Sequence, residues 1–346
     1  MTIVGNVESD YLHGAGDIRE RDSTVYVPSA LNSTLVIVGA SKKGKLEVLG
    51  RVTAEALRGA TAVELSPQGG KKGAPVYAYV AAQETNSIVV VDVTQSRAPR
   101  LVKVLTDERD LGGVCSLSIN ESGDTLFAAA CARDRVSAIE LTNPEDPIIS
   151  STVQLSGAHD IHYCAEKLHV ASGPARRISV LSARNKQLLK HSSLKDLRLT
   201  HTYAIMTNPA QAQIFAASEA AGGTLSMLSM GNSTQDDGGD LPAQLELKKH
   251  VPSSGKYGIN EISGIKSLAV MKGKLYATAG KRHTGKGTVV SMHIDGDTPR
   301  LDEHVTDEQL DRAERIAADH ETGTLFVVSP DHPRVVAIAT EKQGWF

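Results

Sequence analysis

The chain of 346 residues carries 37 basic and 40 acidic side chains, which give it a net charge of −3. This balance argues against a general electrostatic attraction to nucleic acid or to an anionic membrane surface. Hydrophobic residues make up 40% of the sequence but aromatic residues only 4%. The composition therefore indicates a large aliphatic core, and it disfavours proteins that bind sugars or bases on aromatic platforms.

The chain shows no targeting segment and no membrane span. Its N-terminus lacks a basic region followed by a long apolar run, and nothing later approaches roughly 18 continuous apolar residues. Three cysteines, Cys115, Cys131 and Cys164, have no metal-binding spacing. We therefore expect a cytoplasmic protein with free, buried thiols.

The most regular stretch of the chain is Val76–Leu105. Runs of β-branched and aromatic residues at Val76–Ala81, Ile88–Val93 and Leu101–Leu105 are separated by polar segments rich in Asn, Ser, Gln and Pro. This alternation predicts three short β-strands joined by turns. Such a unit has an apolar surface that it cannot cover alone.

The second strand of each unit recurs along the chain. Similar segments begin at Thr24, Pro75, Thr125, Lys167, Gln213, Lys274 and Thr324, with spacings of 42 to 61 residues. Each is followed by a third strand, most by a fourth, and each is preceded by a short apolar first strand. Seven copies with a period near fifty residues predict a seven-bladed β-propeller of four-stranded antiparallel blades, in preference to a solenoid.

The two ends of the chain are expected to meet. The last copy, Asp311–Phe346, contains only three strand-like segments, whereas Thr2–Val7 resembles an isolated fourth strand. We predict that Thr2–Val7 completes the last blade and closes the ring, which removes open sheet edges. The alternative is a free N-terminal extension. With closure, residues 1–346 form a single propeller domain.

Parts of the repeat resemble a known family. The residues concerned are Tyr79–Ala81, Ile88–Val93 with Pro99 after them, and Ala158–Ile161 at the start of the fourth unit. They are similar to the LVIVD-repeat β-propellers. The resemblance is sharp only in the second and fourth units, because the corresponding strand drifts elsewhere to sequences such as AIEL and SVLS. It implies a propeller fold, but it implies no single function because propellers carry unrelated activities.

Propeller topology nominates candidate site residues at the approaches to the first strands, around the mouth of the central channel. These approaches bring imidazole, carboxylate and amide groups from distant parts of the chain to one concavity, as a divalent metal or an acid/base pair requires. The candidates for catalysis are Asp17, His159, Asp160, His201 and Glu261, and those for binding one metal ion are His159, His201 and Glu261. Each of these residues could equally satisfy a neighbouring backbone group within the packed blades.

Cationic residues gather in the predicted loops on the same face. Guanidinium groups bind carboxylate or phosphate through paired hydrogen bonds, so this enrichment points to an anionic ligand. The alternative is a solvated loop surface. The candidate ligand-binding residues are Arg133, Arg135, Arg176, Arg177, Tyr203, Lys281, Arg282 and Arg315.

Two classes of function follow. The first is a binding or scaffold propeller that engages an acidic partner segment or a small anionic molecule at the channel mouth, and it is compatible with membership in a larger assembly. The second is a propeller enzyme, such as a lactonase, hydrolase, cyclase or isomerase, with a metal or acid/base site at the mouth. No catalytic motif supports the second class. A third hypothesis is a cell-surface repeat module, which the missing secretion signal disfavours.

Overall fold

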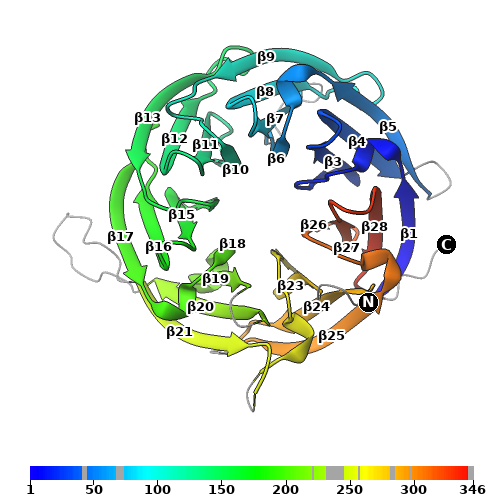
Figure 1. Cartoon of the computed structure of the whole chain (residues 1–346), viewed down its shortest axis with the longest axis vertical. Coiled ribbons are helices and arrows are strands. Elements are labelled where there is room, and N and C mark those ends of the chain that lie inside the picture. Colours follow the sequence, from blue (N-terminus) through cyan, green and yellow to red (C-terminus); the bar gives the residue numbers. More distant parts are fainter. Residues whose placement is uncertain are drawn as a thin grey trace.

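The computed structural model describes residues 1–40, 45–67, 74–219, 222–230, 245–255, 258–280, 285–296 and 298–341. Within these ranges, seven four-stranded antiparallel sheets follow one another in a ring (Figure 1). The expected all-β, seven-bladed propeller is therefore confirmed. No helix of the described residues has the length and apolar character needed to cross a bilayer.

Each blade runs from an inner first strand to an outer fourth strand. Blade 1 contains β2 (Arg19–Arg21), β3 (Thr24–Ser29), β4 (Thr34–Ala40) and β5 (Leu46–Thr53). Blade 2 contains β6 (Ala60–Leu65), β7 (Tyr77–Ala82), β8 (Ser87–Asp92) and β9 (Arg100–Thr106). Blade 3 contains β10 (Val114–Ile119), β11 (Thr125–Ala130), β12 (Arg135–Glu140) and β13 (Ile148–Gln154). Blade 4 contains β14 (Asp160–Cys164), β15 (Lys167–Ser172), β16 (Arg177–Ser182) and β17 (Leu189–Lys195).

The remaining blades follow the same order. Blade 5 contains β18 (Thr202–Asn208), β19 (Gln213–Ser218), β20 (Thr224–Met230) and β21 (Leu245–Pro252). Blade 6 contains β22 (Ser267–Met271), β23 (Lys274–Ala279), β24 (Gly287–His293) and β25 (Arg300–Asp307). Blade 7 contains β26 (Arg315–Asp319), β27 (Thr324–Val328), β28 (Arg334–Ala339) and β1 (Thr2–Glu8).

The sequence pattern explains the layering of each blade. The second and third strands are almost wholly buried, because each sheet packs on both faces against a neighbouring blade, and they read as continuous Val, Ile and Ala runs such as Ser87–Asp92. The outer strands β1 and β25 alternate between exposed and half-buried residues. Apolar clusters fill the spaces between adjacent blades, so that Val25 of blade 1 shares a cluster with Phe326 of blade 7.

The N-terminal strand closes the ring. β1 pairs antiparallel with β28, from Thr2 opposite Ala339 to Glu8 opposite Arg334 (Figure 1). The predicted closure is therefore observed, and the strand extends one residue beyond the predicted Thr2–Val7. Because a strand from one end of the chain pairs with a strand from the other, β28 is paired on both sides and β1 takes the place of the outer fourth strand.

Two kinds of loop lie on the face that we call the mouth face. They are the segments that lead from an outer strand into the next first strand and the turns between second and third strands. Short 3₁₀ helices occupy several of the leading segments: η1 (Asp10–Leu12), η2 (Glu55–Leu57), η3 (Leu197–Leu199), η6 (Asn260–Ile262) and η7 (Glu308–Leu310). Another, η4 (Pro209–Gln211), joins the first two strands of blade 5 on the opposite face.

Candidate functional site

The first strands surround a central cavity with a volume of about 390 Å³. Because residues two apart in a strand point to the same side, each first strand contributes similar positions to the same depth of the channel. Asp17, Asp160 and Arg315 line one level, while Arg19, Glu64 and His162 line the next. The structure therefore brings together six residues from four blades, and three of them, Asp17, Asp160 and Arg315, are candidates that the sequence nominated.

The two candidate catalytic aspartates are engaged between blades. Oδ2 of Asp17 accepts a hydrogen bond from the Val63 amide at 3.1 Å, and Oδ2 of Asp160 accepts one from the Ile205 amide at 2.8 Å. Each carboxylate thus binds the first strand of the next blade. We call these contacts inter-blade latches, and they give both aspartates a structural role.

Further latches occur at the same depth. Ser116 Oγ donates to Oδ1 of Asp160 at 2.8 Å and accepts from the Ile161 amide at 3.2 Å. Nε of Arg315 donates to the Gly16 carbonyl at 3.0 Å, which joins blade 7 to blade 1. Arg315, expected to bind a ligand, therefore already has a protein partner.

Arg19 pairs with two carboxylates inside the channel. Its guanidinium lies 3.0 Å from Oδ1 of Asp17 and 2.9 Å from Oε1 of Glu64. Burial acts to lower the pKa of Arg19, but the two carboxylates outweigh it and the net shift is upward. Burial also raises the pKa of Glu64, against the opposing effect of Arg19. Arg19 and Glu64 were not among the residues predicted from the sequence, although each follows a channel-lining position by two residues.

His159 and Tyr203 occupy matching positions, each directly before a residue that lines the central cavity, Asp160 in blade 4 and Ala204 in blade 5. Their rings meet edge to face with centroids 4.9 Å apart, and the Tyr203 hydroxyl lies 3.1 Å from Nδ1 of His201. Nδ1 of His159 is buried without a hydrogen-bond partner among the described residues. Burial lowers the pKa of His159, with a raising contribution from Asp160, so the ring is neutral near pH 7.

The backbone at His201 adopts a conformation that favours glycine. Its φ is +55°, and the corresponding residue in most other blades is Gly14, Gly59, Gly113, Gly157 or Gly264, all with positive φ. A side chain in the left-handed region costs on the order of 1 kcal/mol. Arg312 of blade 7 adopts the same conformation with a φ of +51°, so the backbone alone gives His201 no special role, and its contact with Tyr203 is what places it beside His159.

The expected metal ligands do not form a cluster. Glu261 lies in η6, and no group of three or more His, Cys, Asp or Glu side chains within the described ranges is arranged to hold a metal ion. His159 and His201 both contact Tyr203 instead of facing a shared centre. The arrangement offers hydrogen-bonding and acid/base groups at the mouth, but it provides no coordination sphere.

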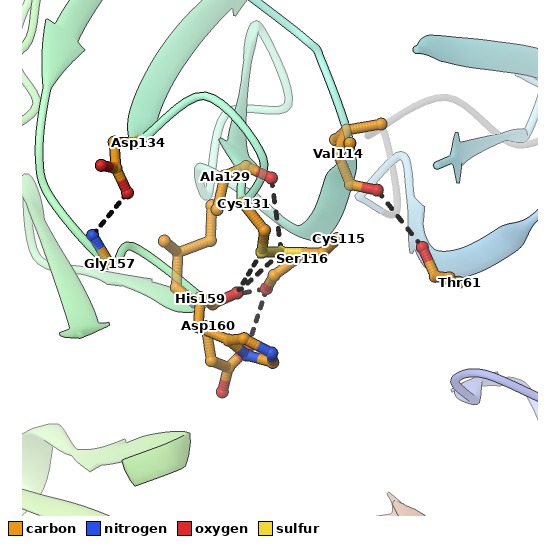
Figure 2. Close-up of a disulfide and its surroundings, with 12 residues drawn as sticks. Thr61, Val114, Cys115, Ser116, Ala129, Cys131, Asp134, Gly157, His159 and Asp160 are labelled. Atoms are coloured by element: carbon orange, nitrogen blue, oxygen red, sulfur yellow. Dashed lines mark hydrogen bonds between the residues drawn. A yellow bond between two sulfur atoms is a disulfide. The ribbon is translucent and has the colours of Figure 1, made fainter. Parts of the chain in front are cut away.

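The expectation for the cysteines is wrong for two of the three. Cys115, at the start of β10, is bonded to Cys131, which follows β11, while Cys164 is free and half-buried. Figure 2 shows the disulfide beside the His159 carbonyl, with Sγ of Cys115 lying 3.2 Å from that oxygen. The bond pins the turn after β11 to the channel wall. Sequence separation alone gave no sign that the two Cα atoms lie 6.0 Å apart.

Four of the candidate arginines form two pairs on adjacent blades. In blade 3, Arg133 lies 2.9 Å from Glu108 and Arg135 lies 3.0 Å from Asp110. Both arginines border a surface depression of about 450 Å³ that Gln154 also lines. Their charges are therefore largely offset by acidic neighbours.

In blade 4 the arginines are not offset in this way. Arg176 is exposed, with a φ of +55°, and Arg177 is half-buried. Neither side chain forms an ion pair within the described part of the chain, and Nε of Arg177 is buried without a hydrogen-bond partner there. Lys281 and Arg282, also expected to bind the ligand, lie outside the described residues.

Two histidines of blade 4, the buried His169 and the half-buried His162, predict a pH-dependent stability. His169 has no exposed surface, and burial lowers its pKa to about 4, while burial lowers the pKa of His162 to about 3. The unfolded chain binds these protons near pH 6.5, so stability present above that pH is lost as the pH falls. Urea unfolding should show a loss of about 2 kcal/mol per histidine between pH 7.5 and pH 5.

The substitution His169→Gln tests this linkage, because it removes one titrating group and keeps a hydrogen-bonding side chain opposite the His162 carbonyl, which lies 3.2 Å from Nδ1. The variant's free energy of unfolding should vary less with pH than that of the original protein. Parallel pH profiles for the two proteins would show that His169 is not responsible.

Comparison with known proteins supports the fold alone. No protein-family model matches the sequence, and no curated protein sequence matches it significantly. The propeller domain of Cps50 (Swd1) from Myceliophteria thermophila superposes with a TM-score of 0.71 at 12% identity, covering 98% of this chain and 99% of that one. A chain of the mitotic checkpoint complex gives 0.65 at 13% identity, with coverages of 97% and 89%.

An enzyme is among the structural neighbours as well. Virginiamycin B lyase from Staphylococcus aureus superposes with a TM-score of 0.66 at 10% identity, covering 97% of this chain and 98% of that one. All of these identities are too low to transfer an activity. The comparisons therefore establish that the chain has the architecture shared by these propellers, and its chemistry has to be argued from its own residues.

Proposed function

We propose that the protein is a binding propeller whose mouth face engages an acidic segment of a partner protein. The observation that carries this proposal is the pair Arg176 and Arg177, whose charges lack acidic partners among the described residues, next to the arginine-lined depression of blade 3. Guanidinium groups bind carboxylates through two parallel hydrogen bonds, which makes such a surface suited to Asp or Glu side chains.

Other features agree with a role in an assembly. Two structural neighbours are, by their names, a domain of Swd1 and a chain of the mitotic checkpoint complex. The LVIVD-like runs in β8 and at His159–Ile161 support a relationship to that repeat family as part of the proposal. A cytoplasmic location is also part of the proposal, although a disulfide such as Cys115–Cys131 is more typical of oxidising compartments.

A peptide-binding measurement tests the proposal. The probe is a fluorescent peptide of alternating Glu and Ala residues, and fluorescence anisotropy reports its affinity. The double substitution Arg176→Glu with Arg177→Glu should weaken binding at least about tenfold, and binding should decrease with added salt. The matched control is Arg97→Glu with Arg100→Glu, which changes the charge equally on the opposite face, where both arginines pair with acidic residues.

The outcomes separate the alternatives. Equal losses in the two double variants would show that net charge alone drives binding, which contradicts the proposal. Competition by millimolar inorganic phosphate or citrate with an affinity equal to that of the peptide would assign the surface to small anions instead of a partner segment.

A second candidate is an enzyme with an acid/base site at the mouth. It is favoured by His159, whose buried Nδ1 lacks a partner among the described residues, and by the neighbouring Tyr203 hydroxyl, which lies 3.1 Å from Nδ1 of His201. Since Asp17 and Asp160 are held in latches, the proton transfers would fall to His159. Incubation with a panel of simple lactones should show hydrolysis that His159→Ala abolishes. Turnover no faster than in buffer would remove this candidate.

A further inference from the structure

Blade 4 lacks a turn that precedes the first strand in every other blade. The 3₁₀ helices η1, η2, η3, η6 and η7 form this turn in blades 1, 2, 5, 6 and 7, and Asp107–Asp110 forms it in blade 3. Each turn leads to a buried leucine or isoleucine. In blade 4 the corresponding buried residue, Leu155, follows directly on Gln154, the last residue of β13.

In blade 3 the turn satisfies two side chains of β12. Nη1 of Arg135 pairs with Oδ1 of Asp110 at 3.0 Å, and Ser137 Oγ donates to the Asp110 carbonyl at 3.0 Å. One aspartate of the turn therefore neutralises an arginine through its carboxylate and satisfies a serine through its backbone.

Blade 4 presents the same two side chains without the turn. In β16, Arg177 and Ser179 occupy the register positions of Arg135 and Ser137, since Arg177 pairs with the last residue of β15 just as Arg135 pairs with the last residue of β11. Nε of Arg177 and Oγ of Ser179 are both buried and lack a partner within the described ranges. Such buried, unsatisfied groups are uncommon in folded proteins.

A third buried donor of blade 4 also lacks a partner among the described residues. In blades 1 and 5, the serine that ends the second strand donates to a carbonyl just after the turn: Ser29 to His13, and Ser218 to Thr200. The corresponding Ser172 of blade 4 is fully buried, and its Oγ has no partner among the described residues. The counterpart of these carbonyls in blade 4 is that of Ser156, and Ser329 of blade 7 also lacks a partner although η7 is present, so the missing turn accounts only for the two donors of β16, Arg177 and Ser179.

We propose that the partner segment supplies the missing turn of blade 4. The segment carries an aspartate whose carboxylate pairs with Arg177 and whose backbone carbonyl accepts from Ser179, as Asp110 does in blade 3. The exposed Arg176, next to Arg177 in the chain, adds attraction for further acidic residues. This inference rests on the proposed function and specifies its binding mode, since an acidic turn matches the unsatisfied donors in both charge and hydrogen-bonding character.

The test uses the protein's own turn as the probe. A labelled peptide with the sequence of residues 106–113, TDERDLGG, should bind the full chain, and the same peptide with Asn in place of the second aspartate should bind at least about tenfold more weakly. Arg177→Gln and Ser179→Ala should each weaken binding of the first peptide, whereas Arg97→Gln on the opposite face should not. Circular dichroism checks that each variant is folded.

A graft gives the decisive comparison. Inserting Asp-Glu-Arg-Asp between Gln154 and Leu155 should supply the missing turn within the chain. The grafted protein should then no longer bind TDERDLGG, and its thermal midpoint should rise. Failure of that peptide to bind at millimolar concentration, or unchanged binding by the grafted protein, would overturn the inference. If the grafted protein also binds the Glu/Ala peptide with full affinity while Arg176→Glu with Arg177→Glu does not, the mouth face binds acidic segments but blade 4 receives no turn.

Discussion

Removing residues 1–8 should lower the thermal midpoint by more than about 10 °C and cause aggregation. The deletion exposes the whole edge of β28, including Val335, Val336 and Ile338, after the loss of the ladder that runs from Thr2 to Glu8. Its backbone hydrogen bonds contribute roughly 0.5–1.5 kcal/mol each, so the summed loss reaches several kcal/mol. An open, apolar strand edge is also a template for pairing with other chains. Differential scanning calorimetry and light scattering measure the two effects.

A substitution within the same strand provides the control. Val4 is one of the exposed large apolar residues and points away from the core, so Val4→Thr keeps the backbone ladder and should change the midpoint little. A truncated protein that melts within about 2 °C of the complete chain, without scattering, would show that the ring does not depend on β1.

The propeller architecture could be predicted because each repeat consists of segments of strongly strand-forming residues. Buried second and third strands need Val, Ile, Ala and Leu at nearly every position, so Tyr77–Ala82 and Ser87–Asp92 stand out without any knowledge of their neighbours. The incomplete last copy then required a strand from elsewhere. Local strand propensity and the closure of the ring favour the same fold, so the repeat in the sequence was sufficient to predict it.

The candidate site was less predictable because its contacts join different blades. Whether Asp160 faces solvent, a metal or the Ile205 amide depends on the register between two strands 45 residues apart, which no local pattern encodes. The Cys115–Cys131 bond has the same origin, since it follows from the path of β10 and β11. Residue types therefore indicated which face could carry a site. Which atoms each side chain contacts follows only from the three-dimensional arrangement.

The sequence contained one sign of the turn that blade 4 lacks. The spacing between the strand segments at Thr125 and Lys167 is the shortest in the repeat, 42 residues. Only the strand registers show that part of this shortening is a missing turn on the mouth face, above β15 and β16. The physical consequence, two buried donors of β16 without partners, could not be read from the spacing because it depends on how the turn of blade 3 satisfies their counterparts.

Asp160→Ala should destabilise the protein by about 3 kcal/mol, the other large effect that we expect. The substitution removes two latches at once, because Asp160 accepts from Ser116 Oγ through Oδ1 and from the Ile205 amide through Oδ2, each at 2.8 Å. Unsatisfied buried donors cost about 1–3 kcal/mol each, and more when the lost acceptor was charged. Urea unfolding at pH 7.5 measures the change, and Asp160→Asn should lose less because its amide oxygen can still accept one bond.

The matched control for this prediction is Glu261→Gln, which changes another candidate carboxylate of the mouth face. Glu261 is half-buried in η6 and forms no ion pair or side-chain hydrogen bond within the described residues, so its substitution should alter the free energy of unfolding by less than about 0.5 kcal/mol. If Asp160→Ala proves as neutral as Glu261→Gln, the latch does not hold blades 3, 4 and 5 together. The Asp160 carboxylate would then have been retained for chemistry at the mouth, which would strengthen the enzyme candidate over the binding propeller.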